Sequence, residues 1–492
     1  MACAEVDVCD GLPAWSIVGY LSAEVKEARE RVRISLKNAG YFLAPKKVTV
    51  NLSPADIRKA GTSFDLAIGM AVLAGYGYIP CEELAAVCLI GELGLDGSVQ
   101  KVNGVLPMLY AARKAGISKA VIPEGNEAEG SLLQDIQVYT VASVKDCVRL
   151  LEKQFDKTPV KPFDMTQTNW VSQQEDFSQI VGQENVKRAI TVAVAGGHNL
   201  LMIGPPGAGK SMLAKRIPTV MPPPSYKEIL DICAIHSVAG CMPQDGSLPR
   251  SRPFRNPHHS ITSTALIGGG TWARPGEISL ASGGVLFLDE LGEFKSGLLD
   301  LLRQPLEEKK VWVTRYHARY EYPADCLFVA ATNPCRCGYY PDRSRCQCSE
   351  DAVKRYMGKM SGPVLERMDI TISVAPVPFE RLLEKKTGIS TTQMRQQVCL
   401  ARKRQEMRQG DVVNGNLSVE QIRKFCTLGD EAEAIVGQAF SHYGFSARVY
   451  HRILRVARTI ADLEESGEIC TSHIREAIGY RGGFWREGGE RL

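Results

Sequence analysis

Residues 204–211 combine glycines and side chains that could bind a chain of phosphates. They are Gly204, Pro205, Pro206, Gly207, Ala208, Gly209, Lys210 and Ser211, between an apolar strand pattern at 200–203 and a helical pattern. In such a loop backbone N–H groups curl around phosphate oxygens, the lysine reaches the β- and γ-phosphates, and the serine ligates Mg²⁺. A chance glycine-rich turn is the alternative, but the strand before it and the helix after it favour binding of ATP and Mg²⁺.

Two acids follow a second apolar strand, in the stretch GGVLFLDELGEF. The strand at 285–288 ends in Asp289 and Glu290. A carboxylate at Asp289 would ligate Mg²⁺, and one at Glu290 would polarise the attacking water. The alternative is a strand that ends in two acids without a catalytic role, and the phosphate loop upstream disfavours this alternative.

A third strand and two arginines complete the series. The strand at 327–331 leads to Asn333, placed to orient water near a γ-phosphate. Arg367, in SGPVLERMDI, is a candidate arginine finger acting on a neighbouring subunit's nucleotide, and Arg448, at the start of a helical pattern, is a candidate second phosphate sensor. Either arginine alone could be a solvated surface residue. An arginine finger that acts on a neighbour implies a ring.

The order of these motifs resembles that of AAA+ ATPases, and within them the chain is similar to the YifB/ComM family of magnesium-chelatase-like ATPases. The resemblance covers essentially residues 10–485 and includes RPFRNPHHSITSTALIGGG, LRQPLEEKKV, NPCRCG and SARVYHRILRVARTIADL. It implies a Mg²⁺-dependent motor that forms a ring, by analogy a hexamer. The motor would be of the branch-migration helicase type that acts on single-stranded or branched DNA in natural transformation.

The elements that must position these residues divide the chain into four parts. Residues 1–155 alternate short strand and helix patterns, 156–175 are a polar linker, 176–378 alternate strands and helices around the motifs, and 379–492 are helical. The fold class is therefore α/β. The resemblance implies a Lon-protease-like α/β domain first, then an AAA+ P-loop αβα domain, then a helical lid.

A basic, aromatic hairpin precedes the third strand. Strand patterns at 311–314 and 319–322 flank a four-residue turn at 315–318. Arg315 and Arg319 suit a nucleic-acid backbone, and Tyr316 and His317 suit sugar or base stacking. A plain covering hairpin is the alternative, and Lys309 and Lys310 at its base could be solvated only.

By resemblance, this is the hairpin before the first sensor, and 252–278 include the helix-2 insert, both facing a central pore. The insert contains His258 and His259. Adjacent histidines usually point apart, so a metal site there is not favoured.

Four cysteines cluster after the third strand: Cys335, Cys337, Cys346 and Cys348. Four thiolates in a short loop match a tetrahedral structural Zn²⁺ site, although the two Cys-x-Cys pairs are tighter than the usual knuckle. Free or redox-active thiols and an iron–sulfur cluster are the alternatives.

The N-terminal part resembles the proteolytic domain of Lon, which uses a Ser–Lys dyad. Ser63 lies at the serine position, but the lysine position falls on Leu106, which cannot accept a proton. We expect a non-proteolytic domain used for ring assembly or partner contact. Family members usually begin with an additional strand-forming segment, and only ten residues precede Gly11. We therefore expect a missing edge strand, unless the chain is a truncated start.

Composition limits the remaining classes of function. The net charge of +4 is too small to predict nucleic-acid binding by itself, and no stretch suits a signal peptide or a membrane span. Fifteen cysteines, mostly scattered, fit a reducing cytoplasm. The rivals to a DNA motor are a chelatase-type motor, which the Lon-like part and the cysteine cluster argue against, and a protein-remodelling ATPase.

Overall fold

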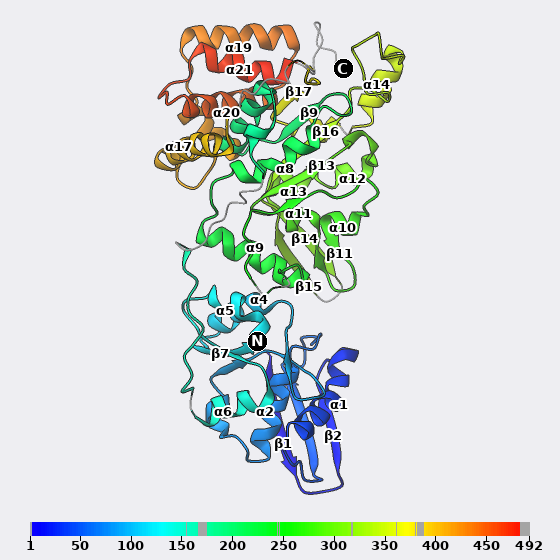
Figure 1. Ribbon diagram of the computed structural model, residues 1–492, viewed down its shortest axis with the longest axis vertical. Coiled ribbons are helices and arrows are strands. Elements are labelled where there is room, and N and C mark those ends of the chain that lie inside the picture. The colour runs from blue at the N-terminus through cyan, green and yellow to red at the C-terminus, as the bar shows by residue number, and fades with distance from the viewer. Residues whose placement is uncertain are drawn as a thin grey trace. The chain divides into compact units, whose positions relative to one another are not determined.

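The computed structural model describes residues 2–153, 155–165, 175–243, 245, 247–315, 318–360, 362–378, 380 and 388–482. The chain forms two compact units (Figure 1). The first comprises Met1–Thr168 together with Cys233–Pro249, and the second comprises Asn169–Ile232 and Arg250–Leu492. The predicted boundary between residues 378 and 379 falls inside the second unit. The return of Cys233–Pro249 to the first unit has no counterpart in the predicted boundaries.

The first unit is a mixed α/β structure with two three-stranded sheets and a short ribbon. One sheet has the order β1-β3-β2 and the other, all parallel, the order β4-β7-β8. Its strands are β1 (Cys3–Cys9), β2 (Ala14–Val18), β3 (Lys47–Ser53), β4 (Val87–Leu89), β5 (Glu92–Leu93), β6 (Val99–Gln100), β7 (Lys119–Pro123) and β8 (Gln137–Val141). Its helices are α1 (Ala23–Asn38), α2 (Asp65–Gly75), α3 (Cys81–Leu84), α4 (Val105–Lys114), α5 (Glu127–Ser131) and α6 (Val144–Glu152).

Strand β1 corrects the expectation of a missing edge strand. It pairs antiparallel with β3 along its whole length, from Cys3 opposite Ser53 to Cys9 opposite Lys47. Ala4, Val6 and Val8 alternate with acids and pack against the core of this unit. The period of two fixes which face is buried.

The second unit is built on a five-stranded, all-parallel sheet of order β10-β13-β16-β9-β17. The strands are β10 (Phe254–Arg255), β13 (Val285–Leu288), β16 (Leu327–Thr332), β9 (Leu200–Ile203) and β17 (Ile370–Ser373). Alternate residues of the central strands enter two different apolar clusters, with Phe287 in one and Leu286 in the other. Both faces are therefore covered, which is why these strands read as continuous apolar runs.

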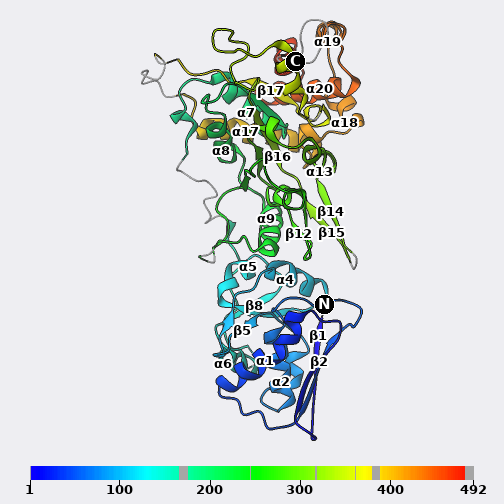
Figure 2. The same cartoon turned by 90° about the vertical axis from the view of Figure 1, so that its right-hand side faces the viewer.

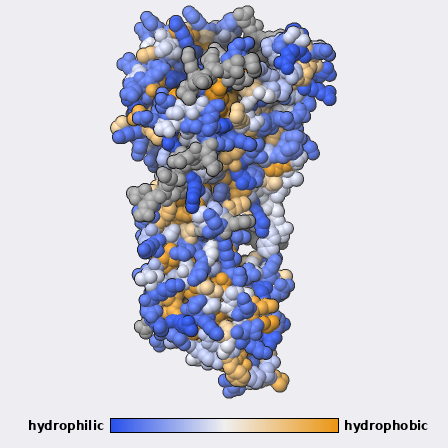
Figure 3. Space-filling model, viewed as in Figure 1, coloured by the Kyte–Doolittle hydropathy of each residue, from blue (hydrophilic) through white to orange (hydrophobic). Residues whose placement is uncertain are grey.

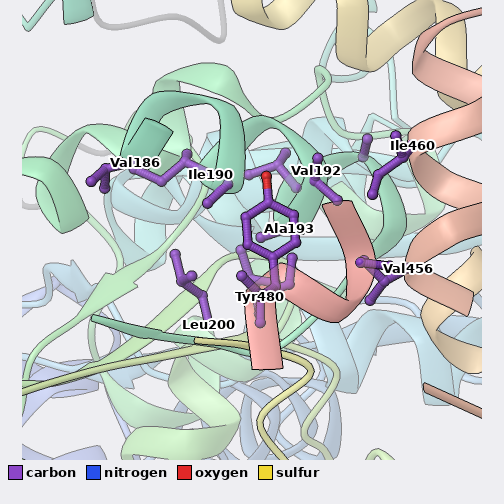
Figure 4. Packing of buried hydrophobic residues seen from close by; sticks show 14 of the residues in the cluster. Val186, Ile190, Val192, Ala193, Leu200, Val456, Ile460 and Tyr480 are labelled. Atoms are coloured by element: carbon purple, nitrogen blue, oxygen red, sulfur yellow. The ribbon is translucent and has the colours of Figure 1, made fainter. Parts of the chain in front are cut away.

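One face is covered by helices from distant parts of the chain. Val186 and Ile190 of α7 belong to the same apolar cluster as Val456 and Ile460 of α20 (Figure 4). The helices that supply residues to this cluster are α7 (Glu184–Gly196), α8 (Lys210–Val220), α17 (Thr391–Gln409), α18 (Val419–Phe425), α19 (Asp430–Tyr443), α20 (Ala447–Leu463) and α21 (Thr471–Gly482). The C-terminal helices thus share a core with the sheet, and α20 confirms the helix predicted near Arg448.

The other face carries the insert and the hairpin (Figure 2). The elements here are α10 (Ser263–Ile267), β11 (Gly268–Gly269), β12 (Arg274–Pro275), α11 (Glu277–Leu280), α12 (Ser296–Asp300), α13 (Arg303–Glu308), β14 (Lys310–Arg315), β15 (Ala318–Pro323), α14 (Glu350–Gly358) and α15 (Gly362–Leu365). Helix α9 (Tyr226–Ala239) precedes them in the chain, and its residues from Cys233 onward belong to the first unit.

The hairpin β14–β15 confirms the predicted strands but not the four-residue turn. Arg315 pairs with Ala318, so both are strand residues and only Tyr316 and His317 stand between the strands. Those two lie outside the described residues, as do the side chains of Arg315 and Ala318.

Hydrophilic residues dominate the face drawn in Figure 3, with hydrophobic ones scattered between them. Among the helices described, none combines the length and the apolar character needed to cross a bilayer.

Candidate nucleotide site

The phosphate loop leads from β9 directly into α8. Gly207 and Gly209 adopt left-handed φ angles of 78° and 85°, which a residue with a Cβ rarely adopts. A Cβ at Gly207 would meet no atom within 4 Å, so the loop leaves open space on that side. The N-terminus of α8 follows at once, which supplies unpaired N–H groups for an anion.

Lys210, the first residue of α8, bridges the loop and the neighbouring strand. Its Nζ donates to the carbonyls of Gly204 at 2.6 Å and Pro205 at 2.9 Å, and to Asn333 Oδ1 at 3.0 Å. Burial lowers the pKa of Lys210, while Asp289 and Glu290 oppose that shift. The ammonium is held by neutral oxygens that a phosphate could replace.

The two predicted Mg²⁺ ligands are in contact. Ser211 Oγ donates a hydrogen bond to Asp289 Oδ2, and the other carboxylate oxygen accepts from the backbone N–H of Glu290 at 2.9 Å. A hydroxyl beside a carboxylate is an oxygen donor set that suits a hard cation. Glu290 itself has a left-handed φ of 52°, an uncommon backbone for a non-glycine residue.

A cavity of about 340 Å³ gathers the predicted phosphate-side residues. Because β9, β13 and β16 are parallel neighbours, their carboxyl ends meet at one edge and bring the three motifs together. Its lining consists of Pro206, Gly207, Ala208, Gly209, Lys210, Ser211, Met212, Asp289, Glu290, Thr332 and Asn333. The shape, the cationic lysine and the hydroxyl–carboxylate pair fit a magnesium nucleotide.

His259 stands beside Glu290, a contact that local sequence spacing does not predict. Its Nδ1 lies 3.8 Å from Glu290 Oε2. The expectation that the adjacent histidines point apart is wrong here, since the rings of His258 and His259 have centroids 4.0 Å apart. Strand β10 runs parallel to β13, so the segment after β10 reaches the same sheet edge as Glu290. The Gly-rich motifs carry no signal of that pairing.

The two predicted arginines lie together in a different pocket. Arg367 and Arg448 line a cavity of about 450 Å³ that shares no residue with the nucleotide cavity. Arg367 is buried and paired with Glu307, and its burial lowers its pKa. The other ionisable lining residues are Glu307, Lys309, Asp369, His451, Arg452 and Arg455. Cations outnumber acids, which suits an anion.

The four clustered cysteines bring their sulfur atoms together. The Sγ atom of Cys335 lies 3.3 Å from that of Cys337 and 3.7 Å from that of Cys346, and with Cys348 all four lie within 4.8 Å of one another. Zn–S bonds of about 2.3 Å in a tetrahedron place sulfurs about 3.8 Å apart. A backbone hydrogen bond at Tyr339 lowers the pKa of the Cys337 thiol to about 6. The donors fit a tetrahedral metal.

The hairpin β14–β15 carries an arginine that stacks on an exposed tryptophan ring. The Arg319 guanidinium lies over the Trp312 ring, 3.9 Å from its centroid, and Trp312 is 40% exposed. At the base, Lys310 pairs with Glu321, and Lys309 with Asp325. Of the predicted contact residues, only the Arg319 side chain is among those described.

In the first unit, position 106 holds a buried leucine on α4. Its backbone N–H donates to buried Glu129, whose carboxylate also accepts from Asn126 and from Ser237. Ser63 is partly buried just before α2. This position therefore offers a side chain that cannot act as a base.

Comparison with known proteins agrees with this architecture. Three family models match: "Magnesium chelatase, subunit ChlI" over residues 176–382, "Subunit ChlI of Mg-chelatase" over 4–126, and "Magnesium chelatase, subunit ChlI C-terminal" over 388–481. "Lon protease 2" of Bacillus subtilis is 27% identical over 140 residues, 28% of this chain and 24% of that protein.

Two relatives match over nearly the full length. "Uncharacterized protein YifB" of Escherichia coli is 40% identical over 97% of this chain and 93% of its own length. "Competence protein ComM" of Haemophilus influenzae is 39% identical over 97% of this chain and 94% of its own. The chain therefore belongs to the YifB/ComM family of magnesium-chelatase-like AAA+ proteins, which implies ATPase activity.

Proposed function

We propose that this protein is a Mg²⁺-dependent ATPase that assembles into a ring, a hexamer, and moves DNA. The observation that carries the ATPase proposal is the single cavity that holds Lys210, Ser211, Asp289, Glu290 and Asn333. Bound Mg²⁺ would screen the phosphate charges, with Ser211 and Asp289 as its ligands. Lys210 would neutralise the β- and γ-phosphates, Glu290 would polarise the attacking water, and Asn333 would orient it.

The position of the arginines supports the ring. Arg367 and Arg448 line a pocket apart from the nucleotide cavity of their own chain. Both would therefore contact the γ-phosphate bound by a neighbouring subunit, where developing charge needs a cation. Each subunit boundary then forms one complete site, and closure of such head-to-tail contacts gives a ring.

The hairpin supports DNA as the substrate of movement. Arg315 and Arg319 would bind phosphates, with Tyr316 and His317 stacking on sugars or bases. Strand β15 is followed closely by β16, which leads directly to Asn333, so the hairpin is attached to the nucleotide site. A relative named "Competence protein ComM" is consistent with branch migration during DNA uptake. The Lon-like part would serve assembly or partner contact and not proteolysis, because Leu106 replaces the base.

We also propose that Cys335, Cys337, Cys346 and Cys348 hold one structural Zn²⁺ per chain. Their sulfur separations support this. Elemental analysis should find about one zinc per chain, and four freely titrating thiols without metal would contradict it.

The rate of ATP hydrolysis with and without DNA tests the motor proposal. Single-stranded, duplex and branched DNA should each be compared across salt concentrations, because phosphate contacts weaken with salt. We expect a DNA-driven increase that Arg319→Ala removes. Lys114→Ala, which removes another exposed cation–ring contact, should leave the increase intact. Lys210→Ala should eliminate hydrolysis. Equal rates with every DNA would instead favour a chelatase-like or protein-remodelling ATPase.

A further inference from the structure

We propose that the metal-bound cysteine loop braces the phosphate loop, so that metal loading sets the affinity for ATP. The cysteine loop is residues 335–348. This inference rests on the proposed zinc site and goes beyond it, because it assigns the metal a role in nucleotide binding.

The first contact between the two loops is at Gly338. Gly338 is buried and has a left-handed φ of 88°. A Cβ there would lie 2.5 Å from Pro206 Cδ and 3.2 Å from Pro206 Cγ. The cysteine loop therefore packs directly on the phosphate loop, with room for a glycine only.

The second contact runs through Asn333. This residue lies two positions before Cys335, and its Oδ1 accepts the hydrogen bond from Lys210 Nζ. Anything that fixes Cys335 also fixes the backbone that presents Asn333. The buried position of Cys335 places its sulfur against the apolar cluster on this face of the sheet.

The loop between the two Cys-x-Cys pairs has further local support. The N–H of Gly338 donates to Cys335 O at 3.0 Å, and the N–H of Cys346 donates to Asp342 O at 2.8 Å. Arg345 lies over the Tyr339 ring, 4.0 Å from its centroid. These contacts shape the loop, and the four sulfurs bring its two ends together. A metal at the sulfurs would close the loop over Pro206.

Two variants separate the packing from the metal. Gly338→Ala should weaken binding of a fluorescent ATP analogue at least about tenfold, because overpacking at Pro206 displaces the phosphate loop. Its zinc content should stay at the wild-type value. Gly410→Ala is the matched control, since Gly410 has a φ of 74° and open space around it. It should bind the analogue normally.

Metal removal supplies the second test. An organomercurial and a chelator should release the zinc, and a metal-sensitive dye should measure how much is released. The Kd of the fluorescent ATP analogue should be measured before and after the release. We expect the ATP analogue to bind more weakly after the zinc is released and to recover its affinity when zinc is added back. The stripped protein should still show a thermal unfolding transition, which shows that it remains folded. Unchanged affinity in both Gly338→Ala and the stripped protein would overturn the brace. Wild-type protein without metal would instead overturn the zinc site, and Gly338→Ala would still test the loop packing.

Discussion

Single side chains in this protein connect the nucleotide cavity to its surroundings. His259 brings the insert to Glu290, at 3.8 Å, and Asn333 brings the strand after the hairpin to Lys210, at 3.0 Å. Glu290 is exposed and has an uncommon backbone conformation, so a ring beside it restricts where its carboxylate can point. Residues of the insert and of the strand after the hairpin are therefore in direct contact with residues of the nucleotide cavity.

The low pKa of buried His198 predicts that acid destabilises the second unit. Its ring is fully buried, with Nε2 2.7 Å from Thr459 Oγ1, and burial lowers its pKa to about 4, against the opposing effect of Asp369. The ring is therefore neutral at pH 7, and its 3.9 Å approach to Asp369 is not an ion pair. Arg455, Arg402 and Arg452 also disfavour the charged ring.

The unfolded chain, with an ordinary histidine pKa of 6.5, binds a proton that the folded ring does not bind until about pH 4. Stability from this residue is complete above pH 6.5 and falls as pH drops toward 4, by about 3 kcal/mol. Denaturant unfolding at pH 7 and 4.5 should show a smaller loss in His198→Gln. An equal loss in both proteins would mean that the folded ring takes up the proton.

At the scale of elements, the hairpin and the insert are in direct contact. The Tyr322 hydroxyl on β15 donates to Ala273 O at 2.7 Å, and Gly268 on β11 approaches Val313 on β14. Burial raises the pKa of Tyr322, so its hydroxyl remains a donor at neutral pH. Movement of either element would therefore be shared with the other.

Tyr322→Phe should weaken this link by about 1 kcal/mol, and the DNA-driven increase in ATP hydrolysis should fall about fivefold. Tyr76→Phe is the matched control, because Tyr76 also donates from a half-buried hydroxyl to a carbonyl, Ala44 O, at 2.8 Å. Hydrolysis rates with saturating branched DNA provide the measurement. A full DNA response in Tyr322→Phe would show that the two elements respond separately.

The sequence predicts elements well where an apolar run ends in a chemical motif. The strands leading to Gly204, Asp289 and Asn333 were predicted with bounds that agree within one residue. Strand β1 was missed although Ala4, Val6 and Val8 alternate with acids, because the comparison with longer family members outweighed that pattern. The order of strands in the sheet determines contacts such as that of His259 with Glu290. The local spacing of residues in the sequence does not predict such contacts.

The same limit applies to larger parts of the molecule. Ser237 joins the first unit by donating to Glu129, a residue 108 positions away, and no composition change marks that return. Arg367 was predicted as an arginine finger and Arg448 as a second phosphate sensor, and the packing of α20 beside the sheet places both in one pocket. Tertiary packing, not local pattern, decides on which subunit's nucleotide they can act.

At the scale of the assembly, shared sites predict complementation between inactive subunits. A Lys210→Ala chain has an intact arginine pocket, and an Arg448→Ala chain has an intact nucleotide cavity. If Arg448 acts across the boundary, a mixed ring contains boundaries where the intact cavity of one chain meets the intact Arg448 of the other. Each variant alone should be nearly inactive, whereas the mixture should recover a fraction of wild-type hydrolysis that varies with the mixing ratio.

The same mixture distinguishes the alternative in which Arg448 serves the nucleotide of its own chain. Every Arg448→Ala chain would then lack its sensor, and every Lys210→Ala chain would lack its lysine, so no mixing ratio could restore hydrolysis. Arg367→Ala mixed with Lys210→Ala supplies the parallel case, because Arg367 lines the same pocket as Arg448. Recovery with both arginine variants would support one composite site per boundary. Recovery of hydrolysis with Arg367→Ala but not with Arg448→Ala would show that Arg448 acts on the nucleotide of its own subunit. If neither arginine variant recovers hydrolysis, the structural argument for a ring fails.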